Sequence, residues 1–288
     1  MKLNNLLSII LTGLIVCVLG SCDTIKEGDR LIYVQPKEDP KEEPEEKPGE
    51  EQEITKCNIL IEDFTGQRCV NCPTATGVIE SLQEKYSDSV VIAVAIPSGP
   101  FGHRTTMSSA RLPLCTEIGD EYYTHWGIEY QPGVKINRGA PIYSSAQYAA
   151  VVREALEQVT PVKMSLSTEY HADTKIVDIT VDAFTSEDVN GKLQVWVTEN
   201  NIVGAQMMPD GSQNMEYVHQ HVFRTSVTSD IFGDNFSVEE GATKSASYTV
   251  TLDEEWDPNN IVIVAFVSNT TDGVLQVVKA NIVDIINE

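Results

Sequence analysis

Two cysteines separated by two residues are the part of this sequence best suited to chemistry. Cys69 and Cys72 lie in the segment RCVNCP, shortly after the apolar run of residues 59–61. A pair with this spacing, placed between a strand and a helix, can form a small disulfide ring at the helix N-terminus, which is the geometry of thiol–disulfide exchange. The same spacing also occurs in half of a zinc site and in inert structural bridges.

The surroundings assign a role to each residue of a redox site. The unpaired N–H groups of a helix N-terminus, with Arg68 alongside, stabilise a thiolate at Cys69, which is predicted to be the exposed nucleophile. Cys72 would resolve the mixed disulfide, and Asp63, at the end of the preceding strand, would accept its proton. A zinc site needs two further ligands that the isolated Cys57 and Cys115 do not offer as a pair, so no metal or other cofactor is expected.

Strands and helices alternate in the first half of the chain, which predicts an α/β layer. Apolar runs predict strands, and proline in a first turn or an apolar face at helical spacing predicts helices. The expected elements are a strand over 57–64, a helix over 73–86, a strand over 90–96, partly helical structure over 104–126, a strand over 132–137 and a helix capped by Ser144 or Ser145.

This half resembles the thioredoxin superfamily. The strand of residues 59–64 followed by the cysteine pair is similar to the thioredoxin active-site strand and loop, and residues 126–132 resemble the segment that ends in the cis-proline of that superfamily. The resemblance implies catalytic roles for Cys69, Cys72 and Asp63, and it implies that Pro132 presents the backbone of an extended client. The chain departs from the usual pattern with Arg68 before the first cysteine and Val-Asn between the two.

After residue 161 the apolar residues recur with period two, as in residues 177–183, 193–197 and 248–252. This pattern predicts about seven strands in an antiparallel β-sandwich. The predicted fold is therefore an α/β thioredoxin-like domain over residues 55–160, followed by an all-β sandwich over residues 161–288.

The N-terminus predicts export and a lipid anchor. A short basic region and an apolar stretch end in Leu-Gly-Ser before Cys22, which resembles a bacterial lipobox in which residues 1–21 are removed and Cys22 is lipidated. The alternative is an ordinary secretory signal with an incidental cysteine. Residues 22–54 are rich in Pro, Glu and Lys and are predicted to be a disordered acidic stalk. We therefore expect an outer membrane lipoprotein, periplasmic or surface-exposed, bound to the membrane through Cys22.

Three further observations limit the partners and the pairing of side chains. The net charge of −23 excludes nucleic acid as a favoured partner. In an oxidising compartment Cys57 and Cys115 would form a structural disulfide or remain separate buried thiols. His219 and His221 share one face of a predicted strand, where they could bind a metal or, as we favour, serve as hydrogen-bonded structural histidines.

The whole mature chain resembles the twenty-eight-kilodalton outer-membrane protein family of Bacteroidetes, lipoproteins with a thioredoxin-like and an Ig-like domain. The resemblance rests on residues 63–73, 132–138 and 219–224. Two functions follow as hypotheses. One is thiol–disulfide exchange on extracytoplasmic clients. The alternative is a non-enzymatic outer-membrane or surface lipoprotein that binds a protein or glycan partner and keeps the cysteine pair as a structural disulfide.

Overall fold

The computed structural model describes residues 55–102, 114–139 and 143–283. The predicted signal segment, the lipidation residue Cys22 and the stalk lie outside the described residues, as does the first part of the region 104–126. The described residues belong to one compact unit, which covers residues 52–288. Within them, no helix combines the length and the apolar character needed to cross a membrane.

The first half of the chain alternates short strands with helices, as the sequence predicts. Its elements are β1 (Thr55–Lys56), β2 (Ile59–Thr65), α1 (Cys72–Tyr86), β3 (Val91–Pro97), α2 (Gly99–Gly102), α3 (Glu117–His125), β4 (Gly133–Ile136), α4 (Tyr148–Ala155) and β5 (Val159–Thr160). Proline in the first turn of α1 costs no hydrogen bond, and the helix buries Ala75, Ile79 and Leu82 at helical spacing. With α4, it covers one face of β2, β3 and β4.

The second half consists almost entirely of strands. They are β6 (Val162–His171), β7 (Ile176–Thr185), β8 (Val189–Glu199), β9 (Ile202–Met207), β10 (Gln213–His219), β11 (Val222–Ser226), β12 (Asp234–Val238), β13 (Thr243–Thr251), β14 (Ile261–Asn269) and β15 (Gly273–Asn281), with the 3-10 turn η1 (Pro258–Asn260) before β14.

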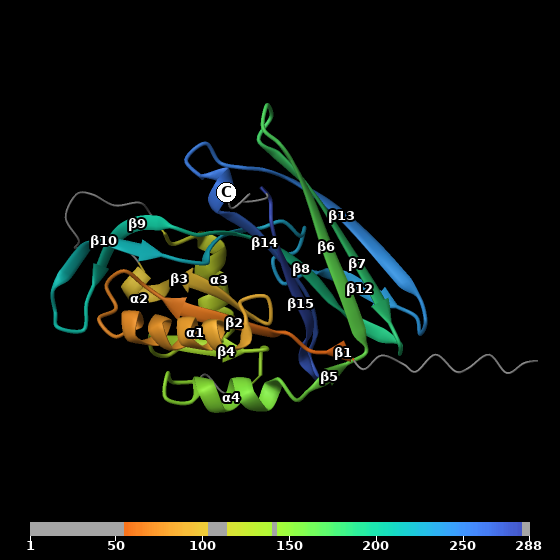
Figure 1. Cartoon of the computed structure of the whole chain (residues 1–288), viewed down its shortest axis with the longest axis horizontal. Helices are drawn as coiled ribbons and strands as arrows, with labels where there is room; N and C mark the ends of the chain where they lie inside the picture. The colour runs from red at the N-terminus through yellow and green to blue at the C-terminus, as the bar shows by residue number, and fades with distance from the viewer. Residues whose placement is uncertain (1–54, 103–113, 140–142, 284–288) are drawn as a thin grey trace, which may run out of the picture. The chain divides into compact units, whose positions relative to one another are not determined.

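One sheet of eight strands runs through both halves (Figure 1). Its order is β15-β14-β8-β11-β3-β2-β4, and β12 also pairs with β8. The two halves join where β11 lies parallel to β3, with Val222 opposite Ala95. The Ala95 N–H donates to the His221 carbonyl at 2.9 Å. The edge that β3 would otherwise present to solvent is therefore occupied by a strand from the second half.

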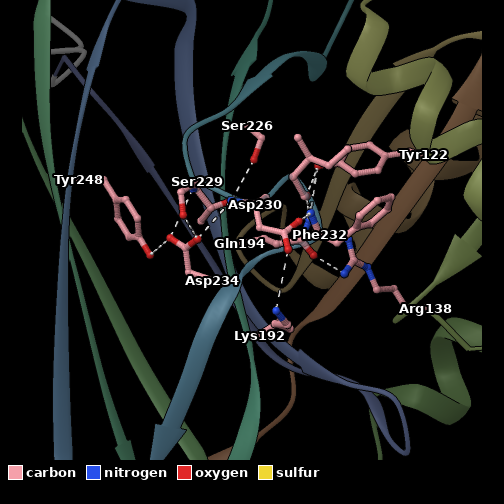
Figure 2. A network of polar contacts seen from close by, with 12 residues as sticks. Tyr122, Arg138, Lys192, Gln194, Ser226, Ser229, Asp230, Phe232, Asp234 and Tyr248 are labelled. Carbon is pink, nitrogen blue, oxygen red and sulfur yellow. Dashed lines mark hydrogen bonds and ion pairs between the residues drawn. The ribbon is translucent and has the colours of Figure 1, made fainter.

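A smaller sheet of order β13-β7-β6 faces the second-half part of the large sheet. Its inward residues, such as Val177, Ile179 and Val181, share one core with residues of β8, β12, β14 and β15. The two sheets also meet in a polar contact, in which the hydroxyl of Tyr248 in β13 donates to Asp234 in β12 at 3.2 Å, as Figure 2 shows. The period-two alternation read from the sequence thus corresponds to a buried and an outward face of this sheet.

The predicted fold class is wrong. We expected an α/β thioredoxin-like domain followed by a separate Ig-like sandwich, but β2, β3 and β4 continue through β11 into β8, β14 and β15. The hydrophobic core is shared as well, because Tyr122 of α3 packs against Trp196 and Phe223 of the second half. The chain is mostly β, and its α/β half is not a domain of its own. Local periodicity predicts where strands lie but not which strands pair across a long sequence separation.

Candidate functional site

The cysteine pair lies between the end of β2 and the start of α1, as predicted. Cys69 and Cys72 form a disulfide with their Cα atoms 5.4 Å apart. The expectation of an exposed nucleophile is not met, because each cysteine is only 2% exposed. A sulfur atom that is covered in this way cannot be reached by the thiolate of a client protein without a change in the structure around it.

The second half of the chain covers the disulfide. The side-chain amide of Gln206 in β9 donates to the Cys69 carbonyl at 3.0 Å and to the Gly66 carbonyl at 3.3 Å. The Met207 N–H of β9 also donates to the loop, to the Gln67 carbonyl at 2.8 Å. In the other direction, the side chain of Gln67 donates to the Ala205 carbonyl at 2.8 Å. Gln67 lies in a segment that carried the family resemblance, but no sequence signal marked Gln206, since residues far apart in a sequence carry no sign of their pairing.

Asp63 and Cys72 line one cavity of about 40 Å³ between β2, α1 and the β9–β10 hairpin. Burial raises the pKa of the Asp63 carboxyl to about 7, and its Oδ1 atom has no hydrogen-bond partner within the described residues. Pro132 is not among the lining residues. Its peptide bond with Gln131 is cis, and the Gln131 side chain donates to the Thr65 carbonyl at 2.7 Å, which fixes this loop at the end of β2.

His219 and His221 lie on the other side of the same cavity. Burial lowers the pKa of both to about 4, so both are neutral at physiological pH. Only His219 belongs to β10, and His221 has a left-handed backbone with φ 55°. No group of three His, Cys, Asp or Glu residues is placed to hold a metal ion in the part of the chain that the structure describes.

The predicted bridge between Cys57 and Cys115 is not formed. Cys57 is a buried free thiol just before β2, with its Sγ 3.7 Å from the Val274 carbonyl oxygen. The Sγ of Cys115 packs against Gly102, which follows β3. Because β2 and β3 are parallel strands of seven residues, these places lie at opposite ends of the sheet, roughly 20 Å apart, whereas a disulfide needs Cα atoms within about 7 Å.

A buried ion pair of the first half lies at the junction with the second half. The Arg138 guanidinium lies 3.1 Å from Glu62 of β2, and their side chains are 7% and 0% exposed. Arg138 also bonds Gln194 of β8, as Figure 2 shows, and lies over the ring of Phe266 at 4.6 Å. Arg138 ends one of the segments that carried the family resemblance, and its role here is to connect strands of the two halves.

Comparison with known proteins decides the family. The family described as outer membrane protein Omp28 matches residues 119–284, more than half of the 288-residue chain. The chain belongs to the Omp28 family. The resemblance read from the sequence motifs is confirmed, and so is the prediction of an outer membrane protein. No curated protein sequence matches the chain.

Two solved structures from Porphyromonas gingivalis are similar to this Omp28-family chain. HBP35 has a TM-score of 0.61 and 17% identity, covering 79% of this chain and 76% of its own. The covered part of this chain is longer than either of its halves, so the similarity extends over both halves. It therefore supports their arrangement in one β-rich fold. A domain of the outer membrane lipoprotein Omp28 is 24% identical over 43% of this chain and 88% of its own, with a TM-score of 0.31, too low to bear on the fold.

Removal of the disulfide is expected to destabilise the protein moderately. Closing a ring of four residues in the unfolded chain is worth about 2 kcal/mol, so the double variant Cys69→Ala/Cys72→Ala should lose about that much free energy of unfolding. Urea unfolding followed by tryptophan fluorescence measures the loss. The parent reduced under denaturing conditions and refolded without oxidant is the control and should match the variant. An unchanged midpoint would contradict a stabilising role for the bridge.

Proposed function

We propose that this Omp28-family lipoprotein is a non-enzymatic outer membrane protein that binds a protein or glycan partner and uses the Cys69–Cys72 bridge structurally. One observation carries the proposal: both cysteines are buried, and Gln206 of β9 is bonded to the loop that contains them. Anchoring through lipid on Cys22 is part of this proposal, and it holds the folded part of the chain at a membrane surface, where partners are met.

The experiment compares exchange activity with binding in the same protein. We expect the parent to accelerate insulin reduction by dithiothreitol no more than the double variant Cys69→Ser/Cys72→Ser does. We also expect both proteins to bind the same ligands on a glycan array or in an extract of surface proteins. Parent-specific acceleration that disappears in the variant, or binding that disappears with the cysteines, would overturn the proposal.

Thiol–disulfide exchange is the second candidate, and one observation favours it. The Asp63 carboxyl lines the same cavity as Cys72 and has a pKa of about 7, which suits a group that exchanges a proton with a thiol near neutral pH. The insulin assay decides between the candidates. For this second function, Asp63→Asn should reduce the rate strongly while Asp173→Asn, an exposed turn position, should not.

A further inference from the structure

The β9–β10 hairpin is separate from the main sheet. Its two strands pair only with each other among the described strands, although they continue from β8 and β11, which pair within the eight-stranded sheet. The ladder breaks at Asn201 and His221, which have left-handed backbones with φ 58° and 55°. Figure 1 shows the hairpin extending beyond the end of the sheet. Residues at the ends of elements that carry such conformations are suitable hinges.

The hydrogen bonds of Gln206, Gln67 and Met207 described above hold the hairpin over the disulfide loop, and they all involve residues 66–69. Beyond the loop, Tyr217 of β10 bonds to Thr76 of α1. The hairpin's outer face carries Val203 and Val218, a directly opposed pair that is 51% and 45% exposed. The exposure on this face of β9 is at Val203, since Ala205, two residues further along, is fully buried.

Two buried polar side chains beneath the hairpin each have an atom without a hydrogen-bond partner among the described residues. These atoms are Asp63 Oδ1 and His219 Nε2, and both side chains line the cavity. The other titratable groups that face Asp63 are Tyr217 of β10, Tyr148 of α4 and His221. Among the residues that the structure describes, no lysine or arginine lines the cavity, so none of them compensates a carboxylate at Asp63.

We propose that the β9–β10 hairpin is a hinged cover over the Cys69–Cys72 loop, closed while Asp63 is protonated and released as the carboxyl ionises. The closed state buries Asp63 and raises its pKa to about 7, whereas an opened state returns it to water and toward 3.8. Because the closed state binds the proton more tightly, a rise in pH from about 4 to about 7 shifts the equilibrium toward the open state. The shift levels off above pH 7.

Reduction of the disulfide in the full chain measures the opening. The probe is a water-soluble phosphine, with released thiols counted over time and the rate divided by that of a peptide of residues 66–75 with the same disulfide. This ratio should rise roughly tenfold between pH 6 and pH 8 in the parent and less than twofold in Asp63→Asn. At pH 6, Gln206→Ala should raise the ratio roughly tenfold, while Gln213→Ala, an exposed site on the same hairpin, should leave it unchanged.

Hydrogen exchange separates a local opening from unfolding of the whole protein. The Met207 amide should exchange faster than the amides of β8, and its protection should fall from pH 6 to pH 8 after correction for intrinsic exchange rates. This measurement on the parent stands even if a variant fails to fold. Equal protection of Met207 and β8, a Gln206→Ala ratio that matches Gln213→Ala, or a pH dependence that survives in Asp63→Asn would overturn the proposal.

Discussion

Replacement of Arg138 by alanine is expected to lower the free energy of unfolding by about 3–5 kcal/mol. The change leaves the carboxylate of Glu62, whose side chain is 0% exposed, without its partner at 3.1 Å. It also removes the contacts of the guanidinium with Gln194 and the ring of Phe266. Urea unfolding at pH 7 measures the loss, with m-values compared to confirm that the same surface is exposed.

Two further variants show whether the unpaired charge causes this loss. Arg153→Ala, at an exposed position of α4, should change the stability by less than about 0.5 kcal/mol. The double variant Glu62→Met/Arg138→Met should recover a large part of the loss, because replacing both members of a buried pair removes the uncompensated charge. A double variant no more stable than Arg138→Ala would show that geometry at the junction, rather than charge, is what Arg138 supplies.

Replacement of Asp63 by asparagine is expected to remove a pH-dependent cost of up to about 4 kcal/mol. The folded state raises the pKa of this carboxyl from 3.8 to about 7, a shift of roughly 3 pH units at about 1.4 kcal/mol each. The folded protein therefore holds the proton that the unfolded chain releases. The parent should lose stability relative to Asp63→Asn as the pH rises from about 4 to about 7, and the difference should stay constant above pH 7.

The comparison between the two proteins isolates Asp63 from the histidines. Burial lowers the pKa of His219 and His221 from 6.5 to about 4, so their contribution is present above pH 6.5 and is lost as the pH falls toward 4. That contribution is the same in parent and variant and cancels in the difference. Chemical unfolding at several pH values supplies the curves, and Asp173→Asn should follow the parent. Parallel curves for the parent and Asp63→Asn would contradict the raised pKa.

The local elements and the family could be predicted from short stretches of the sequence. The apolar run of residues 59–61, Pro73 and the alternation at residues 177–183 are short-range signals, and they correspond to β2, the first turn of α1 and the two faces of β7. The segments around Cys69, Pro132 and His219 resembled the family, and the match over residues 119–284, which includes the last two segments, confirms it. Hydrophobic periodicity indicates which face of a helix or strand is buried, but it does not indicate which other element covers that face.

The way in which the two halves combine depends on contacts between distant parts of the chain. The pairing of β11 with β3 and the contact of Gln206 with the Cys69 loop join residues more than 120 positions apart, and no periodic signal specifies such a partner. For the same reason the number of cysteines could not show whether Cys57 and Cys115 form a disulfide, since the distance between them depends on the direction of β2 and β3. The cysteine pair was therefore located from the sequence, but its burial, on which the proposed function rests, is a property of long-range packing.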